Sequence, residues 1–310
     1  MRIVFMGTPA FAVPSLRTLL EQDHTIATVV TAPDKPKGRG QEIAFSPVKE
    51  FALSRQLALL QPERLKDQSF VSALQALQPD LVVIVAFRIL PKEVFSIPRF
   101  GAFNLHASLL PKYRGAAPIN WAIMNGETET GVTTFFLQEK VDTGSIILQA
   151  RVKIGEDETA GELHDKLADV GAEIVLQTVR LIELGRIHPR NQDETEATPA
   201  PKIFREDCRV DWTNSSLKIH NFVRGLSPHP CAWTNHERRV LKIYKTQLPR
   251  VTKPETQTPG TIVESGAKTL RIATGDSSIS ILEIQQEGKR RMGIEEFLRG
   301  YPVHQEEKFT

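Results

Sequence analysis

The chain has 310 residues and a formal net charge of +2, with 40% hydrophobic and 25% charged residues, which is typical of soluble globular proteins. At roughly 150 residues per domain, this length predicts two domains with buried cores. The longest apolar run, 81–87, is far shorter than the roughly 20 residues of a membrane-spanning helix, and the opening MRIVFMGTP lacks the features of a signal peptide. The two cysteines form no CxxC pair, so we expect a reduced, cytoplasmic protein.

The basic residues are unevenly distributed along the chain. From Lys202 onward there are 18 lysines and arginines against 13 aspartates and glutamates. A basic C-terminal part indicates an anionic partner such as nucleic acid, although chance variation in surface charge would give the same modest excess. The eight histidines show no HExxH or other paired-ligand spacing, so we expect no metal site.

The first part of the chain alternates strand-like with helix-like segments. Short apolar or β-branched runs predict strands at 2–6, 25–31, 81–87 and 102–106. Helical patterns, the second of them opened by a serine cap and a proline, predict helices at 10–22, 46–55 and 67–78. This alternation predicts an α/β fold in which a Rossmann-like, mostly parallel sheet carries helices on both faces.

The alternation continues to about residue 184, after which the character of the sequence changes. We expect strands at 132–138 and 146–153 and helices at 117–125 and 160–184. Residues 188–202, HPRNQDETEATPAPK, are polar and contain proline without periodicity, which is typical of a linker. We therefore expect a first domain at 1–188, a linker at 189–204 and a second domain at 205–310.

The second domain is predicted to be a short helix followed by strands. After a helix at 215–225, turn residues separate five strand-like runs at 231–235, 240–247, 260–264, 269–273 and 278–284. Short, evenly spaced strands of this kind predict a small β-barrel of the oligonucleotide-binding (OB) type.

Candidate functional residues follow two predicted strands of the first domain, at the carboxyl ends where open parallel sheets bind ligands. Gly7-Thr8-Pro9 lacks the GxGxxG spacing, so it forms a tight turn or lines a site that does not bind a dinucleotide. Asn104 and His106 share one face of their strand because successive side chains alternate. Two such donors suit an oxyanion that develops on a carbonyl, although a structural histidine beside a turn residue would give the same pattern.

A third candidate, Asp142, lies in an Asp-Thr-Gly segment between two predicted strands. Such segments are common in hairpin turns, since aspartate caps turns and glycine tolerates positive φ. Alternatively, the carboxylate orients an imidazole or receives a proton. The residue pattern alone leaves both interpretations open.

The segments around these candidates follow a family pattern. They are GTPAFA, DKPKGRGQ, SPVK, NLHASLLPKYRGAAPI, VDTG and, near the C-terminus, GTIVE, ATGDS and EGKRRMGIEEFLRG. Together they closely resemble the methionyl-tRNA formyltransferase family over essentially the whole chain. The resemblance implies transfer of the formyl group of 10-formyltetrahydrofolate, without a metal, to the α-amine of methionine on initiator tRNA, for translation initiation.

The resemblance also implies roles for individual residues. Asn104, His106 and Asp142 match the catalytic trio, in which the first two stabilise the oxyanion and the third orients the imidazole and assists proton removal. The segment implicated in folate binding matches Ser108, Leu109, Leu110 and Pro111, and the pterin pocket would be flanked by the backbone around Phe87, Ile89 and Leu90.

Two parts of the chain are expected to contact tRNA. The loop 33–49 contains a flexible GRG centre and basic residues, and the resemblance implies contacts with the acceptor stem from Lys35, Lys37 and Arg39. A small barrel with surplus positive charge can follow a phosphate backbone, with the candidates Lys242, Lys245, Lys289, Arg290 and Arg291. Each of these side chains, taken alone, would also be an ordinary solvated charge.

The catalytic string does not select the acceptor. Formyltetrahydrofolate hydrolases and transferases that act on nucleotide-sugar amines share it, so both remain alternatives. A non-catalytic RNA-binding protein is a further alternative, but it leaves the catalytic trio unexplained. The chain departs from the family pattern at Ala10, where an acidic residue is common, and in the shorter segment 86–91. We expect a monomer with no membrane partner.

Overall fold

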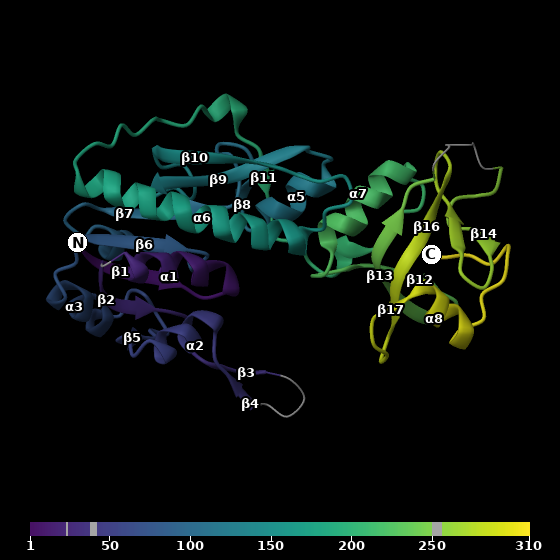
Figure 1. The fold of residues 1–310 in the computed structure, drawn as a ribbon, viewed down its shortest axis with the longest axis horizontal. Coiled ribbons are helices and arrows are strands. Elements are labelled where there is room, and N and C mark those ends of the chain that lie inside the picture. Colours follow the sequence, from purple (N-terminus) through teal and green to yellow (C-terminus); the bar gives the residue numbers. More distant parts are fainter. Residues whose placement is uncertain (23, 38–41, 250–255) are drawn as a thin grey trace. The chain divides into compact units, whose positions relative to one another are not determined.

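The structure, a computed structural model, describes residues 1–22, 24–37, 42–249 and 256–310 (Figure 1). The chain forms two compact units. Unit 1 comprises residues 1–115, 130–152 and 164–199, whereas unit 2 comprises residues 116–129, 153–163 and 200–310. Arg39, which the sequence analysis placed in the tRNA-contacting loop, lies outside the described residues.

Unit 1 is built on a seven-stranded sheet with the order β10-β9-β7-β6-β1-β2-β5. The strands are β1 (Arg2–Gly7), β2 (Thr25–Val30), β5 (Leu59–Leu60), β6 (Leu81–Val85), β7 (Ala102–His106), β9 (Glu129–Phe136) and β10 (Ile146–Lys153). Five neighbouring strands of the sheet run parallel to one another, namely β7, β6, β1, β2 and β5. The next strand, β9, pairs antiparallel with β7. The predicted α/β fold with a mostly parallel sheet is confirmed.

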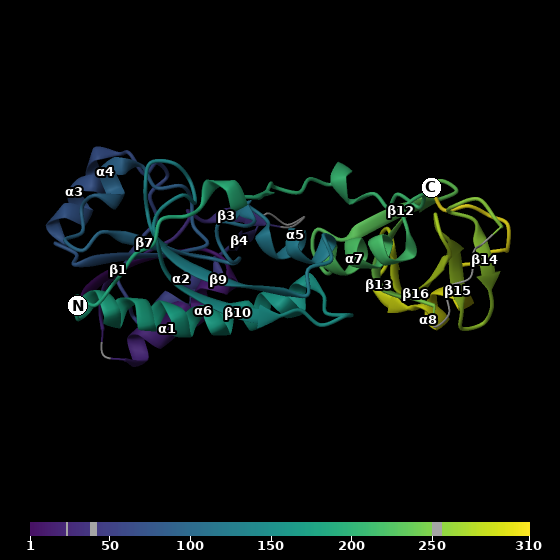
Figure 2. The same ribbon diagram turned by 90° about the horizontal axis from the view of Figure 1, so that it is seen from above.

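Helices cover both faces of this sheet (Figure 2). On one face lie α3 (Gln68–Ala76) and α4 (Lys92–Phe95), and on the other lie α1 (Val13–Glu21) and α6 (Ala160–Glu183). Phe70 and Leu74 of α3 pack in one cluster with Val4, Met6 and Ile84 of the sheet. The apolar face of α3 therefore holds the helix against the central strands.

The packing of α6 determines which way the side chains of β7 point. Gly171 of α6 lies so close to β7 that a Cβ added there would be 2.7 Å from Cδ2 of Leu105. Leu105 therefore faces α6, and the alternation of side chains places Asn104 and His106 on the opposite face.

Two short strands form a hairpin before α2. They are β3 (Lys35–Lys37) and β4 (Glu42–Ala44), which pair antiparallel, and α2 (Pro47–Ser54) follows. The side chain of Ser46 caps α2 by accepting a hydrogen bond of 3.1 Å from the backbone N–H of Lys49. The serine and proline that predicted this helix start therefore fulfil the expected roles.

Unit 2 contains a six-stranded antiparallel sheet with the order β12-β13-β16-β15-β14 and with β17 paired to β16. The strands are β12 (Ala232–His236), β13 (Arg239–Gln247), β14 (Ile262–Ser265), β15 (Leu270–Ala273), β16 (Ser278–Gln286) and β17 (Met292–Gly293). The helices of this unit are α5 (Pro118–Met124), α7 (Ser216–Leu226) and α8 (Ile294–Gly300).

The last residues of the chain close this sheet into a barrel. Asn235 at the β12 edge exchanges two backbone hydrogen bonds of 2.7 and 2.8 Å with Thr310. At the β14 edge, the N–H of Ile262 donates to the carbonyl of Glu307 at 2.8 Å. Phe309 lies between these contacts and is buried in the core of the unit. The predicted small barrel is therefore present, with both of its sheet edges paired.

Both cysteines, Cys208 and Cys231, are free and buried in unit 2. Burial raises the pKa of each thiol to about 11, so both are protonated near neutral pH. None of the helices described is long and apolar enough to cross a membrane.

Candidate active site

The carboxyl end of β7 presents two polar side chains on one face of the sheet. Asn104 is half-buried, and its carboxamide makes no hydrogen bond with the described residues. His106 is buried, and its Nε2 lies 2.8 Å from the carbonyl oxygen of Tyr113. The structure therefore leaves one polar group at this strand end free for a ligand and fixes the other.

The contact with Tyr113 determines which nitrogen of His106 can act on a substrate. A carbonyl oxygen only accepts hydrogen bonds, so Nε2 carries the proton that it donates. In the neutral ring, Nδ1 is then an acceptor, whereas in the charged ring it is a second donor. Within the described part of the chain, Nδ1 has no hydrogen-bond partner, so it can serve a substrate in either state.

Asp142 lies in the loop 137–145, which we call the Asp142 loop and which connects β9 to β10. The backbone of Asp142 is in the left-handed region, with φ at +55°. Two residues later, a Cβ added at Gly144 would lie 1.6 Å from the carbonyl oxygen of Phe136, so only glycine fits there. The Asp-Thr-Gly segment therefore makes a tight turn, as one of the two interpretations expected.

The carboxylate of Asp142 contacts the chain a few residues after β7. Its Oδ2 accepts a hydrogen bond of 3.1 Å from the N–H of Gly115. Because Tyr113 in the same segment accepts from His106, residues 113–115 connect the two groups. Among the described residues, it is the carbonyl of Tyr113 that orients the imidazole, and Asp142 makes no hydrogen bond with it.

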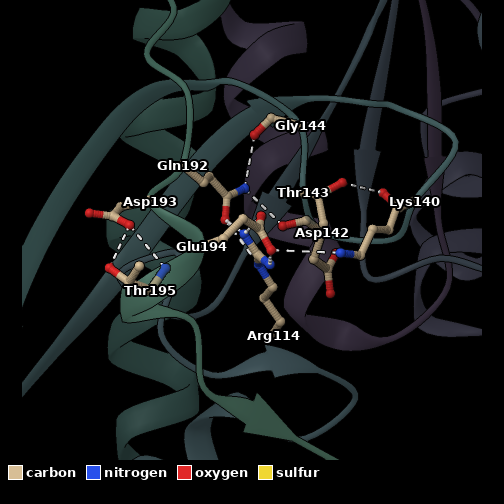
Figure 3. Close-up of polar contacts among 9 residues, drawn as sticks. All are labelled: Arg114, Lys140, Asp142, Thr143, Gly144, Gln192, Asp193, Glu194 and Thr195. Atoms are coloured by element: carbon tan, nitrogen blue, oxygen red, sulfur yellow. Dashed lines mark hydrogen bonds and ion pairs between the residues drawn. The ribbon is translucent and has the colours of Figure 1, made fainter.

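Arg114, in the middle of this segment, binds two residues of the sequence that we predicted to be a linker. Figure 3 shows its guanidinium between Gln192 and Glu194. It donates to Oε1 of Gln192 at 3.0 and 2.7 Å and to the two carboxylate oxygens of Glu194 at 3.0 and 2.8 Å. The hydrogen bond from Arg114 lowers the pKa of Glu194, so this carboxylate is charged near neutral pH.

The segment predicted to bind folate follows β7 and is fixed by two polar residues of the neighbouring strands. Thr133 donates to the carbonyl of Ser108 at 2.6 Å and accepts from the N–H of Leu110 at 3.1 Å. Gln149 donates to the carbonyl of Leu110 at 2.8 Å. The loop is therefore rigidly attached to the sheet close to Asn104.

Side chains in this segment differ in what they can offer a ligand. Ser108 is buried, and its hydroxyl donates to the carbonyl of Lys112 at 2.6 Å. Leu110 is buried in a cluster with Phe135 and Ile146. Leu109 and Pro111 are half-buried, so these two side chains and the backbone remain able to contact a ligand.

The segment after β6, which is predicted to flank the pterin, also contains both buried and exposed side chains. Leu90 is buried with the α3 cluster and Phe87 packs beside it, whereas the side chain of Ile89 is 73% exposed. Arg88 lies over the ring of Phe87 at 5.2 Å and donates to the carbonyls of Pro62 and Glu63 at 2.7 and 2.9 Å. Only Ile89 of the three predicted residues therefore presents a largely exposed side chain.

The basic residues of the loop 33–49 have different surroundings. Lys35 is exposed on β3, and Lys37 belongs to the same strand. Lys49 is buried, forms an ion pair with Asp34 and lies 4.0 Å from the centre of the Phe45 ring. The charge of Lys49 is therefore used to hold the base of the hairpin.

The structure places the predicted basic residues of the barrel on one strand and one turn. Lys242 and Lys245 are exposed on β13, which pairs with β16, and Lys289–Arg291 lie in the turn between β16 and β17. Arg291 lies 4.5 Å from the centre of the Tyr244 ring. Arg290 and Arg291 form ion pairs with Glu296 and Glu283, so both arginines are partly neutralised within the barrel.

Four polar residues that hold these loops were not predicted from the sequence. They are Thr133, Gln149, Gln192 and Thr198. The Oγ1 of Thr198 accepts a hydrogen bond of 2.9 Å from the backbone N–H of Tyr113. Its carbonyl oxygen accepts another, also of 2.9 Å, from the backbone N–H of Arg114. The first two lie on β9 and β10, in stretches where burial does not alternate, so no strand period marks them. The last two lie in the segment without periodicity, where no pattern marks them.

Among the described histidines, cysteines and acidic residues, no group of three could hold a metal ion.

Comparisons with known proteins agree with this architecture. The formyl transferase family matches residues 1–179, and the C-terminal domain of formyl transferases matches residues 202–302. Among solved structures, WlaRD, a sugar 3N-formyl transferase, is similar with a TM-score of 0.68 and 22% identity over 94% of this chain and 99% of its own. HypX from Aquifex aeolicus is similar with a TM-score of 0.65 and 20% identity over 100% of this chain and 50% of its own.

Two curated relatives are similar over nearly their full length. The methionyl-tRNA formyltransferase of Bacteroides fragilis is 48% identical over 97% of this chain and 95% of its own. That of Caldanaerobacter subterraneus is 46% identical over 98% of both chains. The chain therefore belongs to the methionyl-tRNA formyltransferase family.

Proposed function

We propose that the protein transfers the formyl group of 10-formyltetrahydrofolate to the α-amine of methionine on initiator tRNA. A bond forms between the amine nitrogen and the formyl carbon, and the bond between this carbon and N10 of the folate breaks. One proton leaves the amine and one is gained at N10. The products are N-formylmethionyl-tRNA and tetrahydrofolate, which serve translation initiation and one-carbon metabolism.

One observation supports the site of this reaction above the others. The carboxamide of Asn104 and Nδ1 of His106, both without a hydrogen-bond partner in the described part of the chain, lie on one face at the carboxyl end of β7. Donors placed in this way stabilise the negative charge that develops on the formyl oxygen, by about 3–4 kcal/mol for a well-placed donor. His106 donates to this oxygen in its charged form, since Nε2 remains bound to Tyr113.

Asp142 is the proposed acceptor for the proton of the attacking amine. Its carboxylate has one oxygen on the amide of Gly115, so the remaining lone pairs are available to the substrate. The rigid segment Ser108–Pro111 and the backbone around Phe87, Ile89 and Leu90 would form the folate side of the pocket. The site fits a co-substrate of this kind because the carboxamide of Asn104 and Nδ1 of His106 have no hydrogen-bond partner among the described residues.

We place the tRNA on the hairpin and on the barrel. Lys35, Lys37 and Arg39 would contact the acceptor stem, and the barrel would follow the phosphate backbone with Lys242, Lys245, Lys289, Arg290 and Arg291. This assignment corresponds to a catalytic domain at 1–188, a linker at 189–204 and a tRNA-binding domain at 205–310.

The second candidate acceptor is a nucleotide-sugar amine, because sugar formyltransferases share this fold. The test compares kcat/KM for formyl transfer from 10-formyltetrahydrofolate to charged initiator tRNA, to a nucleotide-sugar amine and to water. We expect the tRNA to be preferred by several orders of magnitude, and His106→Ala to lower kcat by about 10²–10³. A higher kcat/KM for the sugar amine, or unchanged transfer by His106→Ala, would refute the proposal.

A further inference from the structure

We propose that Gln192, held in place by Arg114, is a positioning residue for Asp142, so that the predicted linker forms part of the catalytic apparatus. We call Arg114 and Gln192 the linker clamp. The inference rests on the proposed function, because it assigns the clamp to the proton acceptor of that reaction.

The side chain of Gln192 uses its hydrogen-bonding groups fully within unit 1. Its Nε2 donates to the carbonyl oxygens of Asp142 and Gly144, both at 2.8 Å (Figure 3). Its Oε1 accepts two hydrogen bonds from Arg114, one from Nε and one from Nη2. Gln192 is only 9% exposed, so these contacts are shielded from water. A buried amide with all these partners has one orientation.

Arg114 is fixed as firmly as the glutamine that it holds. Its side chain is 13% exposed, and its other donors bind Glu194. Its backbone N–H donates to the carbonyl of Thr198 at 2.9 Å. Two segments far apart in the sequence are thus joined through both main chain and side chain.

The Asp142 loop requires such support because its conformation is unfavourable. A residue other than glycine with φ near +55° costs free energy that the surroundings must offset. The two carbonyls that Gln192 binds lie on either side of Thr143, so these hydrogen bonds fix the peptide planes that follow Asp142 and Gly144. The carboxylate of Asp142 is held at Gly115, the residue after Arg114. The clamp therefore determines where the proposed proton acceptor points.

Gln192→Glu is the sharpest test. Glutamate keeps the length of the side chain and an acceptor for Arg114, but it replaces the two donor hydrogens by an oxygen that repels both carbonyls. We expect kcat for formyl transfer to Met-tRNA to fall about 10- to 100-fold, since a displacement of about 1 Å at a catalytic group has effects of this size. The KM values for both substrates should stay within about twofold of wild type.

Asn191→Ala is the matched control. Asn191 also connects the linker to the Asp142 loop, because its Oδ1 accepts from the hydroxyl of Ser145 at 3.1 Å. Its side chain makes no hydrogen bond with Asp142 or Gly144 in the described structure, so kcat should remain near that of wild type. An equal loss of kcat in both variants would mean that any tether of this loop suffices, and the specific role of Gln192 would be wrong.

A double variant determines whether Gln192 acts through Asp142. In an Asp142→Asn background, Gln192→Glu should cause no further loss of kcat, because the group that it positions no longer accepts the proton. A full additional 10- to 100-fold loss would place the effect elsewhere and overturn the proposal. Wild-type kcat for the single Gln192→Glu variant would also overturn it.

A second readout does not depend on activity. Hydrogen exchange of the Gly115 amide reports its bond to Asp142, and Gln192→Glu should lower the protection of this amide while the melting temperature changes little. Unchanged protection in a folded variant contradicts the clamp. If protection is lost but the wild-type protein forms no formylmethionyl-tRNA, the clamp stands and the proposed function is wrong.

Discussion

The carboxamide of Asn104 is half-buried, and it makes no hydrogen bond with the described residues. Solvent reaches this carboxamide, since among the described residues only Ser15, Arg88 and Arg271 keep a buried side-chain atom without a partner. Its neighbours on β7 are either buried and apolar or, like His106, hydrogen-bonded. At the scale of a single residue, an accessible carboxamide without a hydrogen-bond partner among the described residues is available to a ligand.

We expect Asn104→Ala to lower kcat about 10²–10³-fold, which corresponds to about 2.7–4 kcal/mol of transition-state stabilisation. The melting temperature should stay the same or rise, since no hydrogen bond with the described chain is lost. Steady-state kinetics and a thermal melt measure both quantities.

Asn120→Ala provides the opposite pattern as a control. Nδ2 of Asn120 donates to the carbonyl of Gly225 at 2.7 Å inside unit 2, so its loss should reduce stability by about 1 kcal/mol. It should not change kcat. If Asn104→Ala instead destabilises the protein and leaves kcat intact, Asn104 is a structural residue.

At the scale of elements, the β3–β4 hairpin depends on a small polar network at its base. Asp34 accepts from Lys49 and, at 2.9 Å, from Nε2 of Gln61, which also donates to the carbonyl of Ala32 at 2.9 Å. The hydrogen bond from Lys49 lowers the pKa of Asp34, so the network is intact near neutral pH and weakens as acid protonates the carboxylate.

Asp34→Asn should therefore loosen the hairpin that carries Lys35. We expect KM for Met-tRNA to rise several-fold, with kcat at saturating tRNA and KM for the folate little changed. Asp67→Asn is a control with the same change of charge, because Asp67 precedes α3 and its side chain makes no capping hydrogen bond. Equal KM values for the two variants would show that the hairpin does not bind the tRNA.

The elements that could be predicted from the sequence are those with a strong local pattern. The strand 146–153 was predicted at its observed bounds, and the helix expected at 160–184 ends one residue earlier. The hairpin β3–β4 and the helix α8 were not predicted. Each strand of the hairpin has three residues and one contains proline, and α8 has seven residues behind a glycine cap. Such short elements are stabilised by tertiary contacts more than by propensity.

The same distinction applies to the site. Asn104 and His106 could be found because the period of a strand places them on one face. The partner of His106 is seven residues away, and the contacts of Gln192 span 48 to 78 residues. Such contacts depend on how the chain returns to the sheet, which no local pattern encodes.

At the scale of the whole molecule, buried histidine makes stability depend on pH. His220 is buried in unit 2 beside Thr246 at 3.0 Å, the carbonyl of Glu156 at 3.4 Å and the carboxylate of Asp157 at 3.3 Å. Burial lowers its pKa below the ordinary value of 6.5, the carbonyl of Glu156 and the carboxylate of Asp157 oppose this shift, and Arg224 adds to it. The folded state thus favours the neutral ring.

The unfolded chain binds the proton of His220 more readily than the folded chain does. The contribution of His220 to the free energy of unfolding is therefore complete above about pH 6.5, and it is lost as the pH falls towards the lowered pKa. We expect the free energy of unfolding to decrease by at most about 1.4 kcal/mol per pH unit in this range. His220→Gln should flatten the profile, and His229→Gln, at an exposed position, should leave it as in wild type.

Denaturant unfolding followed by tryptophan fluorescence measures this effect, because all three tryptophans, at 121, 212 and 233, belong to unit 2. Parallel pH profiles for wild type and His220→Gln would rule out the role of this imidazole.

The contacts of Gln192 and Thr198 with residues 113–115 also limit how this enzyme can be recombined with other modules. Connectors between domains ordinarily tolerate added or exchanged residues, because lengthening a flexible loop costs little entropy. Here the segment up to Pro199 belongs to unit 1, so a chimaera that attaches a foreign RNA-binding module must keep the native sequence to that point. Insertions are best placed after Lys202, where the connector has left the Asp142 loop.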